Sequence, residues 1–290
     1  MSRRNKGVPM PSLGLQTDLM FSRYAGRVED VGRYVVITTP HNPNYYFGNY
    51  LLLKKPPQAG QWGDLELDFA RYVGAPPRIK HFAFQWRVSG DEDGADMNGF
   101  MQRGYEYMEC AVLTAKRSML SEPQNINADI DVRMLQSEQD WDAWYELELQ
   151  ERDVDQPGEE YVAFLNGVRD MYRSMIAAGR GDWFGAFQQG ELVGSVGLFF
   201  DERIGRFQNV LTKSSHRSQG ICHTLVHAVA KAGFDRADTL VMVADENYHA
   251  ARIYESLGFQ PSERQASLCR RNDGESKSGE DSGVEASKPE

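Results

Sequence analysis

Hydrophobic and polar residues follow the periods of strands and helices through the second half of the chain. Short apolar runs predict five strands, at Ile130–Met134, Trp183–Phe187, Leu192–Phe200, Arg206–Leu211 and Thr239–Val243. Apolar residues at helical spacing predict helices over Glu138–Leu149, Glu159–Ala178 and from Ile221 to about Phe234. A short helix after Asn247 and a strand at Arg264–Cys269 complete the series. This order predicts a mixed α/β fold, with one twisted mixed sheet flanked by helices on both faces.

The first half of the chain is less regular. Its pattern predicts strands at Tyr34–Thr39, Tyr45–Leu53, His81–Trp86 and Cys110–Ala115, and helices over Leu65–Val73 and Asn98–Met108. Such a mixture is what a degenerate copy of the second half would give, although no repeated motif proves a duplication. The aromatic residues of 45–50 fit a strand packed on both faces better than a ligand site.

A polar segment, Ser121–Asn127, separates the two halves. We therefore expect an N-terminal domain over residues 1–122, a linker over 123–128 and a second domain over 129–271. Residues 272–290 are almost without apolar side chains, so we expect a disordered tail there.

Composition narrows the classes of function. A chain of 290 residues suits two domains. The net charge of −10 argues against a nucleic-acid binder and fits a cationic small molecule or a peptide amine, although most acidic proteins are simply soluble. The three cysteines lie far apart, which favours neither a disulfide framework nor a zinc site and suggests a reducing cytoplasm. No apolar run is long enough to span a bilayer, so no membrane partner is expected.

The turn Arg217-Ser-Gln-Gly220, placed directly before a helix, is the first candidate for chemistry. The amides of a first helical turn lack intrahelical acceptors and can bind phosphate. A glycine at position 220 would let a pyrophosphate approach them, and Arg217 adds attraction for anions. A plain strand-to-helix turn would use the same residues.

A second candidate is the helix that begins near Asn247. Asn247, Ala251 and Tyr254 share one helical face and make a shallow wall for a thin ligand. Alternatively, Asn247 is an N-cap and Tyr254 a core aromatic residue.

Together these two pieces resemble the acetyl-coenzyme A site of the GNAT superfamily of N-acetyltransferases. Arg217-Ser-Gln-Gly220-Ile-Cys222 is similar to that family's Arg/Gln-x-x-Gly-x-Gly/Ala signature, with Cys222 where Gly or Ala is usual. Asn247 to Phe259 is similar to its Asn-x-x-Ala-x-x-x-Tyr-x-x-x-Gly-Phe segment. The resemblance covers about residues 128–270 and implies two tandem GNAT-like domains, the first of them degenerate.

The resemblance also implies roles for individual residues. The strand Asn209, Val210, Leu211 and Thr212 would pair with the pantetheine arm of acetyl-CoA. Arg217, Ser218, Gln219, Gly220, Ile221 and Cys222 would hold its pyrophosphate. Asn247 and Ala251 would contact the cofactor, and Tyr254 would protonate the leaving thiolate.

Other roles stay open at the level of sequence. Candidates for the general base are Glu146, Glu148, Glu151, Asp153 and Asp155, any of which can equally be a solvated carboxylate. A helix N-terminus lowers the pKa of a thiol, yet Cys222 is better read as a small buried hydrophobe than as a nucleophile. His223 and His227 have metal-ligand spacing but no evident third ligand, so no metal is expected.

The leading hypothesis is an acetyl-CoA-dependent N-acetyltransferase that acts on a primary amine of a small molecule or peptide, as a monomer or homodimer. The alternative is a non-catalytic acyl-CoA-binding or regulatory module. A third reading, a tandem transferase of aminoacyl or longer acyl groups, would need a wider cleft. A basic groove for transfer RNA would favour that reading, and the acidic balance does not.

Overall fold

The computed structural model describes residues 12–90, 97–152, 158–245 and 250–272. In the first half its helices and strands are α1 (Leu13–Ala25), β1 (Arg27–Asp30), β2 (Tyr34–Thr38), β3 (Tyr50–Leu53), α2 (Trp62–Tyr72), β4 (His81–Val88), α3 (Asn98–Met101) and β5 (Glu106–Ala115). In the second half they are β6 (Ile130–Met134), α4 (Glu138–Gln150), α5 (Gly158–Ala177), β7 (Gly181–Gln188), β8 (Glu191–Asp201), β9 (Ile204–Thr212), α6 (Ile221–Gly233), β10 (Thr239–Asp245), α7 (Ala250–Ser256) and β11 (Gln260–Arg271). The strands and helices predicted for the second half are confirmed, with ends shifted by a few residues.

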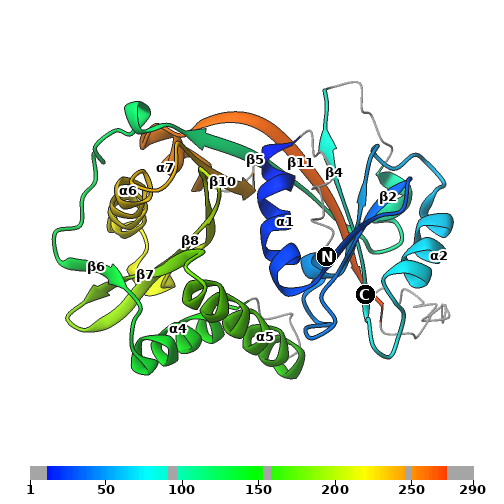
Figure 1. Cartoon of the computed structure of the whole chain (residues 1–290), viewed down its shortest axis with the longest axis horizontal. Coiled ribbons are helices and arrows are strands. Elements are labelled where there is room, and N and C mark those ends of the chain that lie inside the picture. The colour runs from blue at the N-terminus through cyan, green and yellow to red at the C-terminus, as the bar shows by residue number, and fades with distance from the viewer. Residues whose placement is uncertain (1–11, 91–96, 153–157, 246–249, 273–290) are drawn as a thin grey trace, which may run out of the picture.

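All these strands form one mixed sheet that runs through both halves (Figure 1). The strand order is β1-β2-β3-β4-β11-β5-β10-β9-β8-β7-β6. Only the pairs β3–β4 and β9–β10 are parallel, and each is connected by a helix, α2 or α6. The two halves therefore repeat one arrangement of three antiparallel strands, a helix and a parallel strand, which supports the expected mixed α/β fold of two GNAT-like units.

The last strand of each half lies in the sheet of the other. β5, from the first half, pairs with β10, and β11, at the C-terminal end, pairs with β4. β5 and β11 also pair with each other along nine residue pairs at the centre of the sheet. The two halves are thus joined by a reciprocal exchange of strands. The boundary at residues 123–128 stays a prediction.

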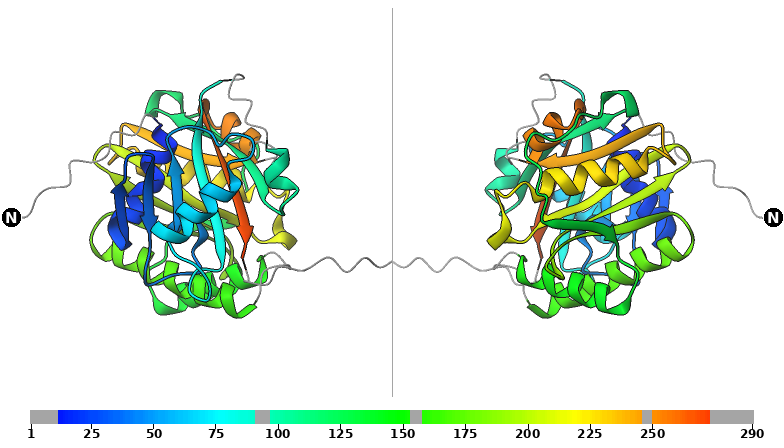
Figure 2. Two further views of the ribbon diagram at one scale, coloured as in Figure 1. Left: turned by 90° about the vertical axis from the view of Figure 1, so that its right-hand side faces the viewer. Right: turned by 90° about the vertical axis from the view of Figure 1, so that its left-hand side faces the viewer.

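Helices cover both faces of the second half, as Figures 1 and 2 show. α6 packs on one face over a core that includes Val196, Leu225 and Leu240. α4 and α5 pack on the other face, around Trp144 and Trp183. Among the helices in the described residues, none has the length and apolar content needed to cross a bilayer.

Helix α1 lies where the two halves meet and contacts β10 and β11 (Figure 1). Its Asp18 forms an ion pair of 2.7 Å with Arg206 of β9. The same carboxylate accepts hydrogen bonds from Gln85 and Gln265. Arg206 is only 6% exposed, so the ion pair is shielded from water. It holds α1 of the first half against the N-terminal end of β9.

Two predictions for the first half are wrong. The strand expected over Tyr45–Leu53 begins only at Tyr50, because residues 46–48 form a 3₁₀ turn. The Asn49 side chain stabilises that turn by accepting from the amide of Thr39 and donating to the carbonyls of Asn42 and Tyr45. The helix expected over Asn98–Met108 ends at Met101. Residues 106–108 pair with β11 instead. Helix α1 and strand β1 have no counterpart among the predictions.

Candidate active site

The two parallel strands of the second half separate toward their C-terminal ends. Their ladder joins residues 204–206 of β9 to residues 239–241 of β10 and stops there, within strands that are fully described. β9 continues to Thr212 and β10 to Asp245. The unpaired ends leave backbone groups of β9 available to a ligand that enters between the strands.

Strand β9 carries a β-bulge where the two strands separate. Between Leu211 and Gln208 it has two residues, Asn209 and Val210, opposite a single residue of β8. Asn209 has a φ of +49°, in the left-handed region. A bulge of this kind redirects backbone and side-chain groups, and such bulges are frequent beside active sites.

A pocket of about 340 Å³ lies beyond this bulge. It is lined by Asn125, Val210, Leu211, Thr212, His216, Arg217, Ser218, Gly220, Ile221, Cys222, His223, Ile253 and Tyr254. The pocket therefore extends from the end of β9, past the start of α6, to α7.

The start of α6 has the geometry of an anion site. Gly220 precedes the helix with a φ of +77°, and a Cβ there would lie 2.8 Å from the carbonyl oxygen of Asn125. Glycine is therefore required both by the backbone angle and by the close approach. The amides of Ile221, Cys222 and His223 belong to the first helical turn and have no intrahelical acceptor. These residues fit a bound pyrophosphate.

Most of the predicted cofactor residues come together in this pocket. Val210, Leu211, Thr212, Arg217, Ser218, Gly220, Ile221 and Cys222 line it, and so does Tyr254, the residue predicted as the acid. Asn209, Gln219 and Ala251 are described but are not among the lining residues. Asn247 lies outside the described residues, as do Asp153, Asp155 and the tail from 273 onward.

Arg217 is held by a carboxylate that the sequence suggested as a base. Glu151 lies 2.9 Å from the Arg217 guanidinium and accepts the Ser214 amide at 2.8 Å. Its side chain is only 7% exposed. Glu151 thus links the end of α4 to the rim of the pocket.

Cys222 lies in the first turn of α6. Burial raises its pKa to about 12. This direction is opposite to the one expected from a helix N-terminus, and its cause is desolvation of the thiolate by burial. Cys222 packs against the core of the second half, in agreement with its reading as a small hydrophobe.

Among the described carboxylates suggested as bases, Glu148 stands apart. It is 6% exposed, whereas Glu146 is exposed and Glu151 is engaged with Arg217. Burial raises the pKa of Glu148 to about 8. The Asn209 carboxamide donates to Glu148 at 2.6 Å and opposes that rise. A carboxyl group that titrates near neutral pH, beside the bulge, can take up a proton during a reaction.

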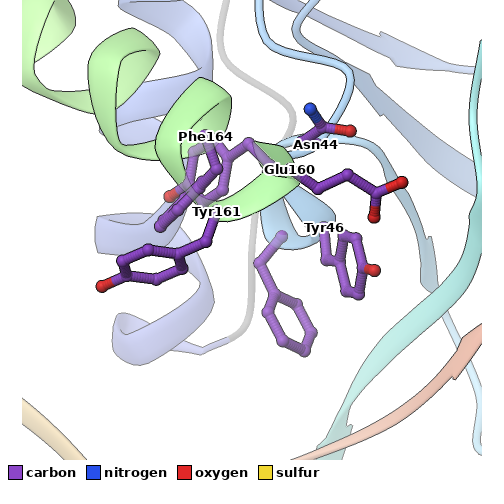
Figure 3. A pocket seen from close by; sticks show the side chains of 7 residues that line it. Asn44, Tyr46, Glu160, Tyr161 and Phe164 are labelled. Carbon is purple, nitrogen blue, oxygen red and sulfur yellow. The ribbon is translucent and has the colours of Figure 1, made fainter. Parts of the chain in front are cut away.

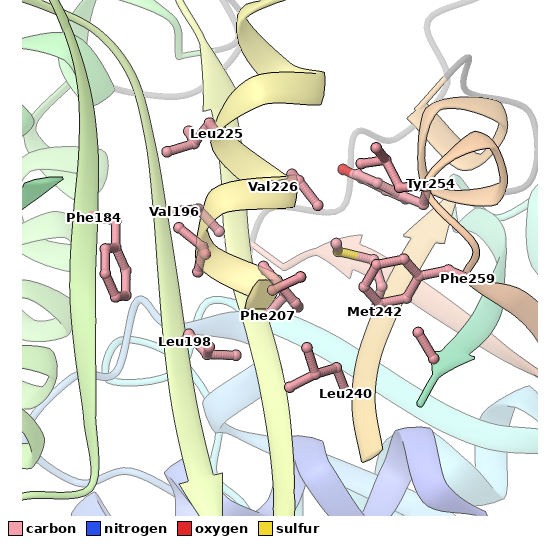
Figure 4. Close-up of a cluster of buried hydrophobic side chains, with 14 of the residues drawn as sticks. Phe184, Val196, Leu198, Phe207, Leu225, Val226, Leu240, Met242, Tyr254 and Phe259 are labelled. Carbon is pink, nitrogen blue, oxygen red and sulfur yellow. The ribbon is translucent and has the colours of Figure 1, made fainter. Parts of the chain in front are cut away.

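Tyr254 lines the pocket from α7. It is 4% exposed and belongs to the core beneath α6 and α7 (Figure 4). Its ring packs near Phe259, with 6.5 Å between the ring centroids. Tyr254 is therefore both a core aromatic residue and a lining residue of the pocket.

The segment between the halves also contributes to the site, which the sequence did not indicate. Asn127 donates from its side chain to the Gln219 carbonyl at 2.9 Å, and its amide donates to the Thr224 hydroxyl at 2.9 Å. Asn125 lines the pocket. The sequence could not single out these two asparagines, because polar residues in a linker show no periodic pattern that distinguishes a contact residue from a solvated one.

The histidines of α6 show no metal geometry. His227 lies 3.6 Å from Glu122, and His223 lines the pocket. The described residues contain no group of three or more side chains placed to hold a metal ion.

Comparisons with known proteins identify the family of the second half. Residues 141–259 match the model of the acetyltransferase (GNAT) family. This part of the chain is a GNAT domain, and the resemblance seen in its motifs is confirmed. The comparison with curated protein sequences gives no significant match.

Solved structures share the fold over most of the chain. A functionally unknown conserved protein from Staphylococcus epidermidis ATCC 12228 aligns with a TM-score of 0.67 at 14% identity, over 86% of this chain and 94% of that one. A GCN5-related N-acetyltransferase from Kribbella flavida aligns with a TM-score of 0.60 at 15% identity, over 90% and 96%. A tandem GNAT protein from the clavulanic acid biosynthesis pathway aligns with a TM-score of 0.50 at 13% identity, over 78% and 74%. These similarities show the fold alone, and that fold is the one of GNAT acetyltransferases.

Proposed function

We propose that the chain is an acetyl-CoA-dependent N-acetyltransferase that acts on a primary amine of a small molecule or peptide. One observation carries the proposal. One pocket combines the free amides at the start of α6 with the end of β9, and the buried carboxyl group of Glu148 accepts a hydrogen bond from Asn209 in the adjoining bulge. These are the parts needed to hold a nucleotide thioester and to remove a proton from an attacking amine.

The cofactor would be held along the pocket. The amides of residues 218–222 bind the pyrophosphate, with Arg217 at the rim. Backbone groups of residues 209–212 would pair with the pantetheine arm, and Asn247 and Ala251 would contact the cofactor, as the resemblance to the family implies. Acetyl-CoA supplies the acyl group as a thioester.

The reaction would be a direct transfer. The amine nitrogen forms a bond to the acyl carbon, and Glu148 takes the proton that the nitrogen loses. A backbone amide of the bulge stabilises the negative charge that develops on the acyl oxygen. The carbon–sulfur bond breaks, and Tyr254 donates a proton to the sulfur.

Thermal unfolding with acetyl-CoA, combined with a thiol-release assay, tests this proposal. At 100 times its Kd, the ligand should stabilise the folded chain by about 2.7 kcal/mol. Acetyl-pantetheine lacks the pyrophosphate and should stabilise much less at the same concentration. Absence of any shift with acetyl-CoA would refute the proposal. Stabilisation without thiol release across amino acids, polyamines, aminoglycosides, arylalkylamines and peptide N-termini would favour the non-catalytic acyl-CoA-binding module.

A further inference from the structure

A second pocket, of about 250 Å³, lies between the two halves (Figure 3). It is formed by residues 44–47 of the first half and by Glu160, Tyr161 and Phe164 at the start of α5. Five of these seven residues are aromatic. Such a lining offers ring faces and few hydrogen-bonding groups, which suits an apolar ligand group.

Contacts among the aromatic residues, and from two residues outside the pocket, hold its walls in place. The rings of Tyr45 and Tyr161 lie 5.6 and 5.7 Å from that of Phe164. Tyr46 stacks on His81 with 4.2 Å between the ring centroids. The Asn42 side chain donates to the Phe164 carbonyl at 2.9 Å and ties the turn to α5. The pocket is therefore formed before a ligand arrives.

The negative charge of Glu160 at the pocket is balanced by two cationic side chains. The Glu160 carboxylate lies 3.0 Å from the ammonium of Lys80 and 3.1 Å from the guanidinium of Arg271. A carboxylate already paired with two cations gives little attraction to a polycationic ligand. The lining thus favours an apolar group over a polyamine or an aminoglycoside.

A chain of contacts joins this pocket to the candidate active site. The Tyr161 hydroxyl donates to the Glu148 carbonyl at 3.2 Å. The Glu148 carboxyl group accepts from Asn209 in the bulge of β9. The aromatic pocket lies on the α4 and α5 side of the sheet, whereas the pocket for acetyl-CoA lies at α6 and α7. A ligand in the aromatic pocket would approach the bulge, and Glu148, from the side opposite the thioester.

We propose that this pocket is the acceptor subsite, and that it takes the aromatic or alkyl group of an arylalkylamine-like primary amine. The inference rests on the function proposed above. The amine would point toward Glu148, and the apolar group would lie between Phe47 and Phe164.

Phe47→Ala tests the subsite, because Phe47 lines the pocket while 37% exposed, so its removal leaves the core intact. With 2-phenylethylamine as acceptor, the variant should raise KM about tenfold and leave kcat and the KM of acetyl-CoA within about twofold, since ground-state binding alone is lost. With ethanolamine, which has no ring, KM should not change. Leu67→Ala, an apolar truncation at a 71% exposed position of α2, is the matched control and should leave the KM of both acceptors unchanged.

Calorimetric titration of 2-phenylethylamine in the presence of CoA gives a readout that does not depend on turnover. If the wild type binds 2-phenylethylamine and Phe47→Ala binds it about tenfold more weakly, the subsite is supported, whether or not thiol is released. Binding without thiol release would count against the proposed function and not against the subsite. Turnover of polar amines, with 2-phenylethylamine neither bound nor preferred, would overturn the subsite and leave the proposed function standing. Equal affinity of the wild type and Phe47→Ala for 2-phenylethylamine would also overturn the subsite.

Discussion

Replacing Glu148 with Gln is the most direct test of the catalytic proposal. The side chain is 6% exposed, and burial raises its pKa from 4.5 to about 8. Gln has nearly the same shape, and its carbonyl oxygen can still accept from Asn209, but it cannot ionise. The substitution therefore removes the titration while keeping the packing.

The first consequence concerns stability as a function of pH. Below pH 4.5 the carboxyl group is neutral in both the folded and the unfolded chain. Between 4.5 and about 8 the unfolded chain loses this proton and the folded chain keeps it, so stability falls as pH rises through the folded pKa. The pKa difference corresponds to about 5 kcal/mol. Glu148→Gln should thus gain about that free energy of unfolding, relative to the wild type, between pH 4 and pH 9.

The second consequence concerns turnover. In the wild type, kcat/KM should rise with pH until about 8, where Glu148 becomes ionised, and then level off. Loss of a general base should lower kcat/KM about 100-fold or more, and the inflection near 8 should vanish. Two acceptors whose amine pKa values differ separate the titration of Glu148 from that of the substrate.

Urea denaturation across pH 4–9 and thiol release across pH 6–10 are the two assays. A stability difference between wild type and Glu148→Gln that stays constant with pH would refute the raised pKa. An inflection near pH 8 that persists in the variant would assign the proton transfer to another group.

Much of the second half could be predicted because its information is local. Periodic apolar runs marked each strand and helix, and the positive φ of Gly220 is a requirement that the amino-acid type itself reveals. The lining of the pocket by residues 210–212, 217–218 and 220–222 follows from one strand–turn–helix connection. Local patterns are enough where neighbours in sequence are also neighbours in space.

The exchange of β5 and β11 could not be predicted in this way. Each strand has the same alternation whichever partner it pairs with, and the residues that meet, such as Cys110 and Gln265, are far apart in sequence. Glu148 could not be selected from the five candidate carboxylates for the same reason, since its burial depends on how α4 packs on the sheet, mainly against β8. The turn at residues 46–48 depends on the side chain of Asn49, whose partners Thr39, Asn42 and Tyr45 all precede the turn in sequence.

Two further substitutions test separate parts of the site, and a third tests the turn after α7. Tyr254→Phe should lower kcat about 100-fold while the Kd of acetyl-CoA, measured by calorimetry, stays within about twofold, because the lost hydroxyl acts only during thiolate departure. An unchanged kcat would remove Tyr254 from that role. Asn127→Ala should raise the Kd of acetyl-CoA several-fold, since its bond to the Gln219 carbonyl orders the turn before α6; equal Kd values would show that the linker is passive. Gly258→Ala should lower the free energy of unfolding by at least about 3 kcal/mol, because φ is +95° and a Cβ would lie 1.8 Å from the Met119 carbonyl oxygen. Gly190→Ala is its matched control, with a φ of +87° and no atom within 4 Å of the added Cβ. Equal losses in urea denaturation would mean that backbone strain alone, and not the close crossing of the segment before the linker, requires glycine after α7.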